Sequence, residues 1–205
     1  AIGTEVTDIS QNNDASMNQL LTAFNDCDQS GPGDNLVLCA NSASNTIDPI
    51  TQTNDATGDQ FTDFFQDNDA VFSQSLDISN NCDETTFIIT SENNEVECGI
   101  DGAENDIGPV SQSNLATGQF DSLADQDNNV DVSQQIVADN TCDGTATHTA
   151  QCSNFETDNF VDTITQSNTA TGELDAASTQ FNNAVIDQNM DVLNDCDEIN
   201  TGDSD

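Results

Sequence analysis

The sequence predicts an all-β fold, a β-solenoid or β-arcade of about four imperfect repeats of 54–60 residues. First, the segment ITQTNDATG (Ile50–Gly58) returns as VSQSNLATG (Val110–Gly118) and as ITQSNTATG (Ile164–Gly172). Second, side chains alternate with a period of two over long runs, which indicates strands. Third, Gln and Asn recur at fixed positions of each repeat, and a fixed repeat is typical of stacked architectures.

The repeats align on a Cys-Asp pair that occurs four times, at Cys27, Cys82, Cys142 and Cys196. Each of these cysteines follows one Gln by 8 residues and another by 16. The chain is therefore predicted to be one domain, with repeats at 1–46, 47–106, 107–160 and 161–205, truncated at the first and last repeat. Because Ala1–Gly3 matches the end of the repeated ATG element, we interpret Ala1 as a mature terminus left by signal-peptide removal.

Alternation assigns the faces of the long strand in each repeat. In the second repeat one face carries Gln66, Asn68, Ala70, Phe72, Gln74, Leu76 and Ile78. Acidic and hydroxyl side chains, such as Asp67 and Ser75, alternate with them and are predicted to face outward. Gly58, Asn80–Asn81 and Gly102 are expected to mark strand ends.

A buried amide is costly unless it is hydrogen-bonded. Amides at the same phase of successive repeats would lie one strand spacing apart and would bond to one another in ladders. The predicted ladder residues are Gln11, Asn13, Gln19, Gln52, Asn54, Gln66, Asn68, Gln74, Gln112, Asn114, Gln126, Asn128, Gln134, Gln166, Asn168, Gln180, Asn182 and Gln188.

The motif Asn-x-Ala-x-x-x-Gln resembles the end of curlin repeats, which build bacterial functional-amyloid fibres. It occurs at Asn13–Gln19, Asn54–Gln60, Asn68–Gln74 and Asn182–Gln188, and with Val for Ala at Asn128–Gln134. The repeat here is more than twice as long as a curlin repeat, and curlins lack these cysteines. In its acidic, cysteine-bearing character the chain also resembles the sheath proteins of methanogenic archaea. Both resemblances imply amyloid-like stacking into an extracellular assembly.

Composition excludes several classes of function. The 205 residues include no Lys or Arg and 39 Asp or Glu, for a formal charge of −39. Nucleic-acid binding and docking on an anionic membrane both depend on cationic side chains. No apolar segment approaches the roughly 18 residues of a membrane-spanning helix, so no membrane insertion is expected. The expected partner is the chain itself, as a homopolymer.

The seven cysteines favour an oxidising compartment. Local pairing is predicted for Cys27–Cys39, Cys82–Cys98 and Cys142–Cys152, because length varies between the members of each pair as it does in surface loops. The alternative is pairing between equivalent cysteines of neighbouring repeats, whose spacing a disulfide also tolerates. Cys196 has no local partner and is predicted to be unpaired or bonded between chains.

No catalytic motif is present, and the chain is predicted not to be an enzyme. The single histidine, His148, lies in a threonine-rich segment and is expected to be an exposed polar residue. No cofactor is expected other than calcium, for which Asp125, Asp127, Asn129 and Asp131 are weak candidates, since the Gly and closing Glu of a calcium loop are missing.

These observations predict an extracellular structural protein that self-assembles by strand stacking into a fibre, tube or cell sheath. The alternative is a monomeric secreted solenoid that binds a ligand, calcium or ice. Alternating hydroxyls such as Thr51 and Thr53 are compatible with ice binding, but they also suit any solvated strand face.

Overall fold

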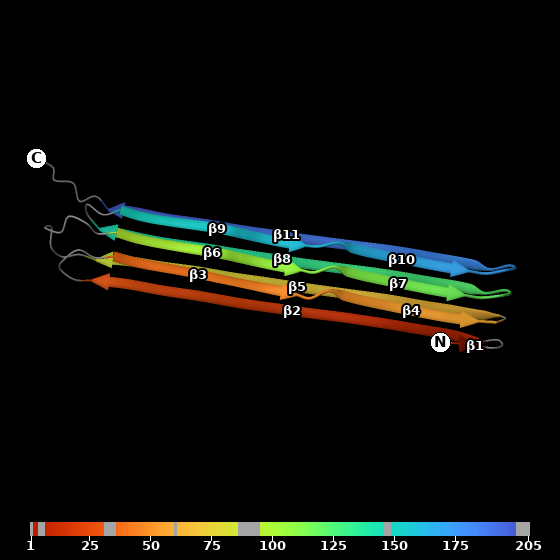
Figure 1. The fold of residues 1–205 in the computed structure, drawn as a ribbon. Helices are drawn as coiled ribbons and strands as arrows, with labels where there is room; N and C mark the ends of the chain where they lie inside the picture. The colour runs from red at the N-terminus through yellow and green to blue at the C-terminus, as the bar shows by residue number, and fades with distance from the viewer. Residues whose placement is uncertain are drawn as a thin grey trace, which may run out of the picture.

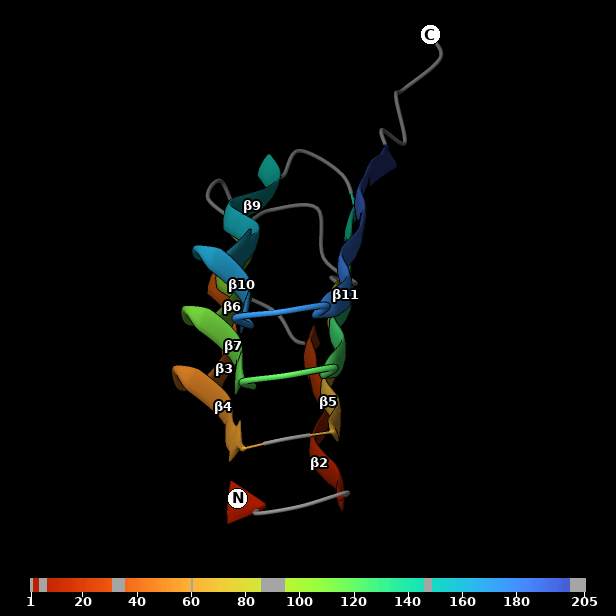
Figure 2. The same cartoon turned by 90° about the vertical axis from the view of Figure 1, so that its right-hand side faces the viewer.

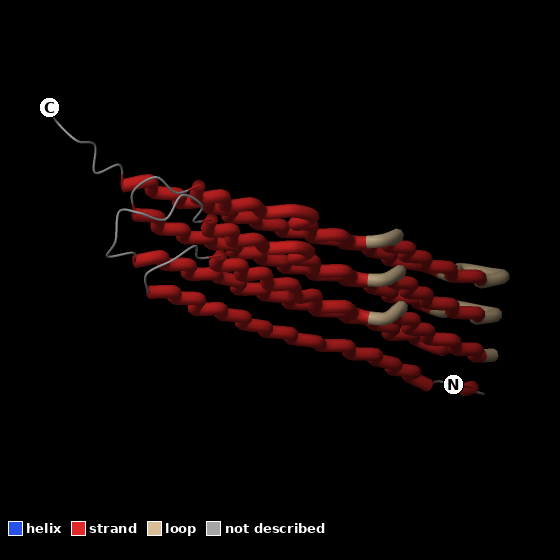
Figure 3. Tube along the Cα trace, turned by 60° about the vertical axis from the view of Figure 1, so that its left-hand side comes forward, coloured by secondary structure: helices blue, strands red, loops and turns tan. Residues whose placement is uncertain are grey.

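The computed structural model describes residues 2–3, 7–30, 36–59, 61–85, 95–145 and 149–199. These residues form strands joined by short turns, without a helix among them (Figures 1 and 3). The strands are β1 (Ile2–Gly3), β2 (Thr7–Ser30), β3 (Leu36–Ile47), β4 (Ile50–Gly58), β5 (Thr62–Thr85), β6 (Glu95–Ile107), β7 (Val110–Thr117), β8 (Leu123–Thr145), β9 (Thr149–Val161), β10 (Ile164–Thr171) and β11 (Ala177–Ile199).

The strands form three parallel sheets in two facing layers (Figure 2). One layer is the long-strand sheet, in the order β11-β8-β5-β2. The other layer consists of the turn-side sheet, β1-β4-β7-β10, and the cysteine-side sheet, β3-β6-β9. Each repeat is therefore an arch: one long strand runs out, and two shorter strands return. The predicted β-solenoid or β-arcade is confirmed.

Neighbouring repeats pair in register, so each residue lies beside its equivalent. Gln66 pairs with Gln11 on one side and with Gln126 on the other. Gly3 pairs with Gly58, which confirms that the N-terminal residues match the end of the ATG element. Adjacent parallel strands lie about 4.8 Å apart, so equivalent side chains form continuous columns across the stack.

The return path is interrupted at one position in every repeat, between the cysteine-side and turn-side sheets. The first two interruptions contain Pro49 and Pro109, which have no backbone N–H to continue the ladder. The third has Thr163 instead, whose N–H donates to the Asp162 carboxylate at 2.7 Å. Different residues thus remove the same backbone donor, and the return strand divides into two.

The turn that follows each ATG element brings the two layers close together. A Cβ atom added to Gly58 would collide with the side chain of Thr62, so only glycine allows this approach. Phe61, Asp121 and Asp175, at equivalent positions of this turn, have positive φ angles of 51°, 42° and 50°. Aspartate tolerates this left-handed conformation better than most residues, whereas Phe61 adopts it without that advantage.

Two predicted strand ends lie inside strands. Asn80 and Asn81 belong to β5, which continues to Thr85. Gly102 lies within β6 with a φ of 83°, at the irregularity where the register of β3 and β6 shifts. The prediction was wrong at these positions because Asn80 is a buried ladder residue and Gly102 forms a bulge, not a turn.

The core lies between the layers and consists of apolar rows separated by amide rows. Phe72 packs with Val132 and Ile107 in one row, and Leu76 packs with Ile136 and Ile100 in another. Amides such as Gln74 and Asn128 are as completely buried as these apolar side chains. The predicted inward face is confirmed, and the interior is both apolar and extensively hydrogen-bonded.

Candidate functional site

The ladder side chains of the long-strand sheet connect all four repeats. Gln66 donates to Gln11, Gln126 donates to Gln66 and Gln180 donates to Gln126, over 3.0, 2.8 and 2.9 Å. A second glutamine column joins Gln19, Gln74, Gln134 and Gln188 over 2.9, 2.9 and 2.7 Å. An asparagine column joins Asn13, Asn68, Asn128 and Asn182 over 2.9, 2.9 and 3.0 Å.

The turn-side sheet carries two further predicted columns. Gln112 donates to Gln52 and Gln166 donates to Gln112, over 2.8 and 3.0 Å. Asn54 donates to Asn114 and Asn114 donates to Asn168, over 3.1 and 3.0 Å. The structure therefore brings together every ladder residue that the sequence predicts.

Most of these amide groups also bond across the core to the opposite layer. The Nε2 group of Gln74 donates along its column and to the backbone oxygens of Asn45 and Asp106, at 3.1 and 3.0 Å. Gln112 makes the same pattern with the backbone oxygens of Asn68 and Asn129. Both amide hydrogens thus have acceptors, which removes the cost of burying the group.

The columns have a direction. In every bond between glutamines of a column, the donor belongs to the later repeat, as when Gln74 donates to Gln19. In every bond between asparagines of a column, the donor belongs to the earlier repeat, as when Asn68 donates to Asn128. Glutamine and asparagine columns therefore run antiparallel to one another through the stack.

Sequence reasoning missed two asparagine columns. One consists of Asn45, Asn105 and Asn159, joined over 3.0 and 2.9 Å. The other joins Asn80 to Asn140 and Asn140 to Asn194, over 2.9 and 3.1 Å. The signal for the second was in the alignment, because an asparagine lies two residues before each of the four Cys-Asp cysteines. A signal for the first was there too, because Asn45, Asn105 and Asn159 each lie 37 residues before the next Cys-Asp cysteine.

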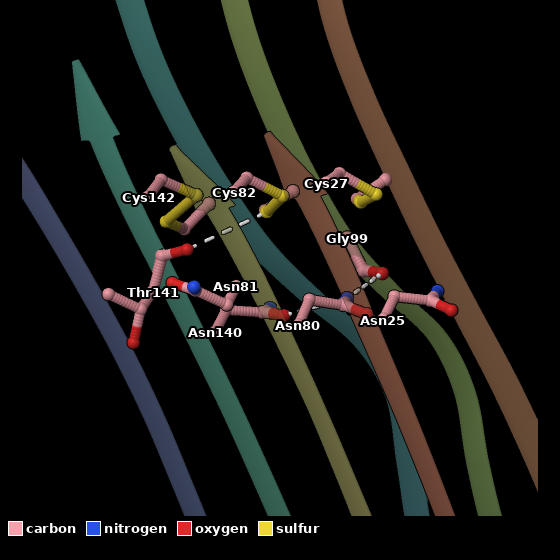
Figure 4. Close-up of a disulfide and its surroundings, with 12 residues drawn as sticks. Asn25, Cys27, Asn80, Asn81, Cys82, Gly99, Asn140, Thr141 and Cys142 are labelled. Carbon is pink, nitrogen blue, oxygen red and sulfur yellow. Dashed lines mark hydrogen bonds between the residues drawn. A yellow bond between two sulfur atoms is a disulfide. The ribbon is translucent and has the colours of Figure 1, made fainter. Parts of the chain in front are cut away.

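The structure forms the three predicted local disulfides, Cys27–Cys39, Cys82–Cys98 and Cys142–Cys152. Each connects the long-strand sheet to the cysteine-side sheet within one repeat, with Cα–Cα distances of 6.3, 6.4 and 6.4 Å. Cys27, Cys82 and Cys142 lie in a row on neighbouring strands (Figure 4). The alternative of pairing between equivalent cysteines is therefore wrong for these six residues.

Three residues named in the sequence predictions fall wholly or partly outside the described structure. The backbone of Cys196 lies in β11 in register with Cys142, but its side chain is outside the described part. His148 and Gln60 lie outside the described residues altogether. The predictions for Cys196 and His148 stay predictions.

Acidic side chains also stack on the outer face. The register places Asp67 beside Asp127 and Asp28 beside Asp83, and the backbone positions of Asp143 and Asp197 continue the second row. Burial raises the pKa of Asp67, and the carboxylates of Asp127, Asp69 and Asp14 raise it further. Burial likewise raises the pKa of Asp127, with a contribution from Asp125 and a smaller opposing effect of the hydrogen bond from the Asn128 backbone. Stacking thus concentrates negative charge that no side-chain cation of the chain neutralises.

The weak calcium candidates are not brought together. Asp125, Asp127, Asn129 and Asp131 alternate along β8 on its outer face. Alternate residues of an extended strand are roughly 6.6 Å apart, whereas a calcium loop converges its oxygens on one point. Within the described ranges, no group of three or more Asp, Glu, His or Cys side chains is arranged to hold a metal ion.

No protein-family model matches the chain, and neither the curated proteins nor the solved structures contain a match. Nor does the described part of the chain contain a helix that is long and apolar enough to cross a membrane. Fold and site together define a disulfide-linked parallel β-arcade with amide-ladder columns. The three disulfides indicate an oxidising environment.

Proposed function

We propose that the protein is an extracellular structural subunit that self-assembles by adding copies along the stacking direction. The observation that carries this proposal is that all three contacts between repeats use the same register and the same ladders. A contact that repeats unchanged within the chain can also repeat between chains.

The two outer strands of the long-strand sheet present surfaces suited to such addition. In β8 the inward side chains Val132 and Ile136 are 0% exposed. Their equivalents in β11, Ile186 and Met190, are 49% and 42% exposed. These positions become buried wherever another repeat is stacked on them, so burial of the same apolar surface favours addition of a second copy.

The composition and the disulfides of the chain suit an extracellular assembly that resists proteolysis. A disulfide closes each of the first three repeats, and a chain without Lys or Arg has no trypsin cleavage site. The likeness of the Asn-x-Ala-x-x-x-Gln motif to curlin repeats supports a fibre, tube or sheath at the cell surface. The competing proposal is a monomeric secreted binding module.

The test is electron microscopy of the purified, oxidised chain, combined with light scattering over time. We expect elongated polymers, which grow faster with millimolar calcium or near pH ~4 than in chelator at pH ~8, because bound cations or protons remove repulsion between stacked carboxylates. Monovalent salt at equal ionic strength should accelerate growth less, since it screens charge without coordinating it. Discrete particles under every condition would instead support the monomeric binding module.

A further inference from the structure

The side chains at the two outer strands of the long-strand sheet have complementary hydrogen-bonding groups. Asn182 of β11 accepts through Oδ1 from Asn128 and Asn168, both at 3.0 Å, so its Nδ2 group is directed away from the stack. Asn13 of β2 donates through Nδ2 to Asn54 and Asn68, both at 2.9 Å, so its Oδ1 atom is directed away. One outer strand thus presents a donor in this column and the other presents an acceptor.

The glutamine columns show the same complementarity with the opposite direction. Gln180 and Gln188 of β11 donate inward to Gln126 and Gln134, which directs their Oε1 atoms outward. Gln11 of β2 accepts inward from Gln66 through Oε1, which directs its Nε2 group outward. The β11 side of the stack therefore has asparagine donors and glutamine acceptors, and the β2 side has asparagine acceptors and glutamine donors.

We propose that the directed amide columns make assembly polar, so that β2 of each added copy pairs in parallel with β11 of the copy before it, in the register Gln11 on Gln180 and Asn13 on Asn182. This proposal rests on the proposed self-assembly and specifies its geometry. The long-strand columns that begin at Gln11, Asn13 and Gln19 then continue across the junction to Gln180, Asn182 and Gln188, with one donor facing one acceptor.

Like ends do not match. Two β11 strands brought together would oppose asparagine donors to asparagine donors, and two β2 strands would oppose acceptors to acceptors. Buried amides left without partners oppose such contacts. Among the described residues the cysteine-side sheet has three strands, and the turn-side sheet ends in the two-residue strand β1. Only the long-strand sheet has a long strand at both ends, so the junction is formed through it.

The apolar surface is compatible with the same register. At one inward position the successive residues are Ile9, Phe64, Ala124 and Ser178. Small side chains in the last two repeats leave a cavity of about 240 Å³ that Phe64, Ala124 and Ser178 line. In the proposed register Ile9 of the next copy follows Ser178 and covers this cavity.

Two substitutions test the two ends of the stack independently. Asn182→Asp keeps the oxygen that accepts inward but removes the outward donor, so it should block the β11 side alone. Gln11→Glu keeps its inward acceptor and removes its outward donor, so it should block the β2 side alone. Asn189→Asp and Asn18→Asp add the same charge on the outer faces of β11 and β2, away from the columns, and are the matched controls.

Sedimentation velocity of the oxidised chains at neutral pH with millimolar calcium distinguishes the outcomes. We expect polymers from wild type and growth within about twofold of wild type from both controls. Each blocking variant alone should remain monomeric, and an equimolar mixture of the two should form dimers and nothing larger. Dimers require one intact β2 side and one intact β11 side, so they also show that both variants are folded.

Other results overturn the proposal. Dimers of either variant alone would show that like ends join, and a mixture that stays monomeric or unfolded would contradict the assigned roles of Asn182 and Gln11. Growth of a blocking variant at the rate of its control would show that the columns do not direct addition. If wild type itself does not grow, the proposed function fails together with this inference.

Discussion

At the scale of single residues, the interior depends on amides that have several partners each. Gln74 is 1% exposed and bonds to Gln19 and Gln134 along its column and to two backbone oxygens across the core. Its neighbour Ser75 faces outward. The two positions therefore differ in what a substitution leaves unsatisfied.

Gln74→Leu should destabilise the chain by more than about 2 kcal/mol, because each buried group without a partner costs roughly 1–3 kcal/mol. Ser75→Leu should change the free energy of unfolding by less than about 0.5 kcal/mol, as is usual for outer positions. Urea denaturation of the two variants measures the difference. Equal losses would show that the assignment of faces is wrong.

Gly58 gives a second comparison at this scale. Gly58→Ala should cost roughly 1–3 kcal/mol, because the new methyl group collides with Thr62 across the turn. Gly99→Ala should be nearly neutral, since its nearest atom would be the Ser153 hydroxyl at 3.6 Å, an ordinary contact. Thermal denaturation of both variants tests this, and equal midpoints would refute the close approach at the turn.

At the scale of elements, much of the fold follows from two sequence patterns: the alternation of side chains along each strand and the fixed positions of Gln and Asn within each repeat. Alternation identified the inward face of β5, and the fixed offsets from the Cys-Asp pairs placed all the predicted ladder residues on facing positions. The sequence-based prediction failed at positions whose role depends on which residues lie beside them in the neighbouring strand. The pair Asn80–Asn81 is typical of a turn, but Asn80 is a ladder residue because its side chain donates to Asn140 on the neighbouring strand. The return strand divides at Pro49 because this residue has no N–H to donate to the adjacent strand, and the sequence alone does not show which backbone groups face that strand.

The disulfides test the pairing of strands within each repeat. Digestion of the unreduced protein with a protease that cleaves at aspartate should yield linked peptides for Cys27–Cys39, Cys82–Cys98 and Cys142–Cys152. Peptides joining Cys27 to Cys82 would contradict the arch. Reduction should lower stability by roughly 2–4 kcal/mol for each closed loop.

Stacked carboxylates predict a pH dependence of stability. The pKa of Asp67 is raised in the folded chain, mainly by burial and then by Asp127, so folding favours its protonated form. Its contribution to stability is therefore fully present below the unfolded pKa and is lost as pH rises through the higher folded pKa.

Asp67→Asn should reduce this loss, so that the variant gains stability over wild type as pH is raised from about 4 to 7. Asp77→Asn is the control, because Asp77 lies between the uncharged Thr22 and Val137 in its column. Urea denaturation at several pH values compares them. Identical pH profiles for Asp67→Asn and wild type would mean that neither burial nor the neighbouring carboxylates raise the pKa of Asp67.

At the scale of the whole molecule, the stack is built from a single contact that is used three times. Amide columns, apolar rows and the disulfide row all run across the strands, along the direction in which β2, β5, β8 and β11 succeed one another. A subunit of this kind is predicted to extend the same columns into the next copy, so the strands of a polymer must lie across its long axis.

X-ray diffraction from aligned polymers of the oxidised chain tests this claim most directly. In-register stacking predicts a reflection near 4.8 Å along the polymer axis and a spacing near 10 Å across it, from the strand separation and the distance between layers. Lateral association of finished arches would instead place the strand reflection away from the polymer axis. A pattern without the axial reflection near 4.8 Å would contradict assembly by strand stacking.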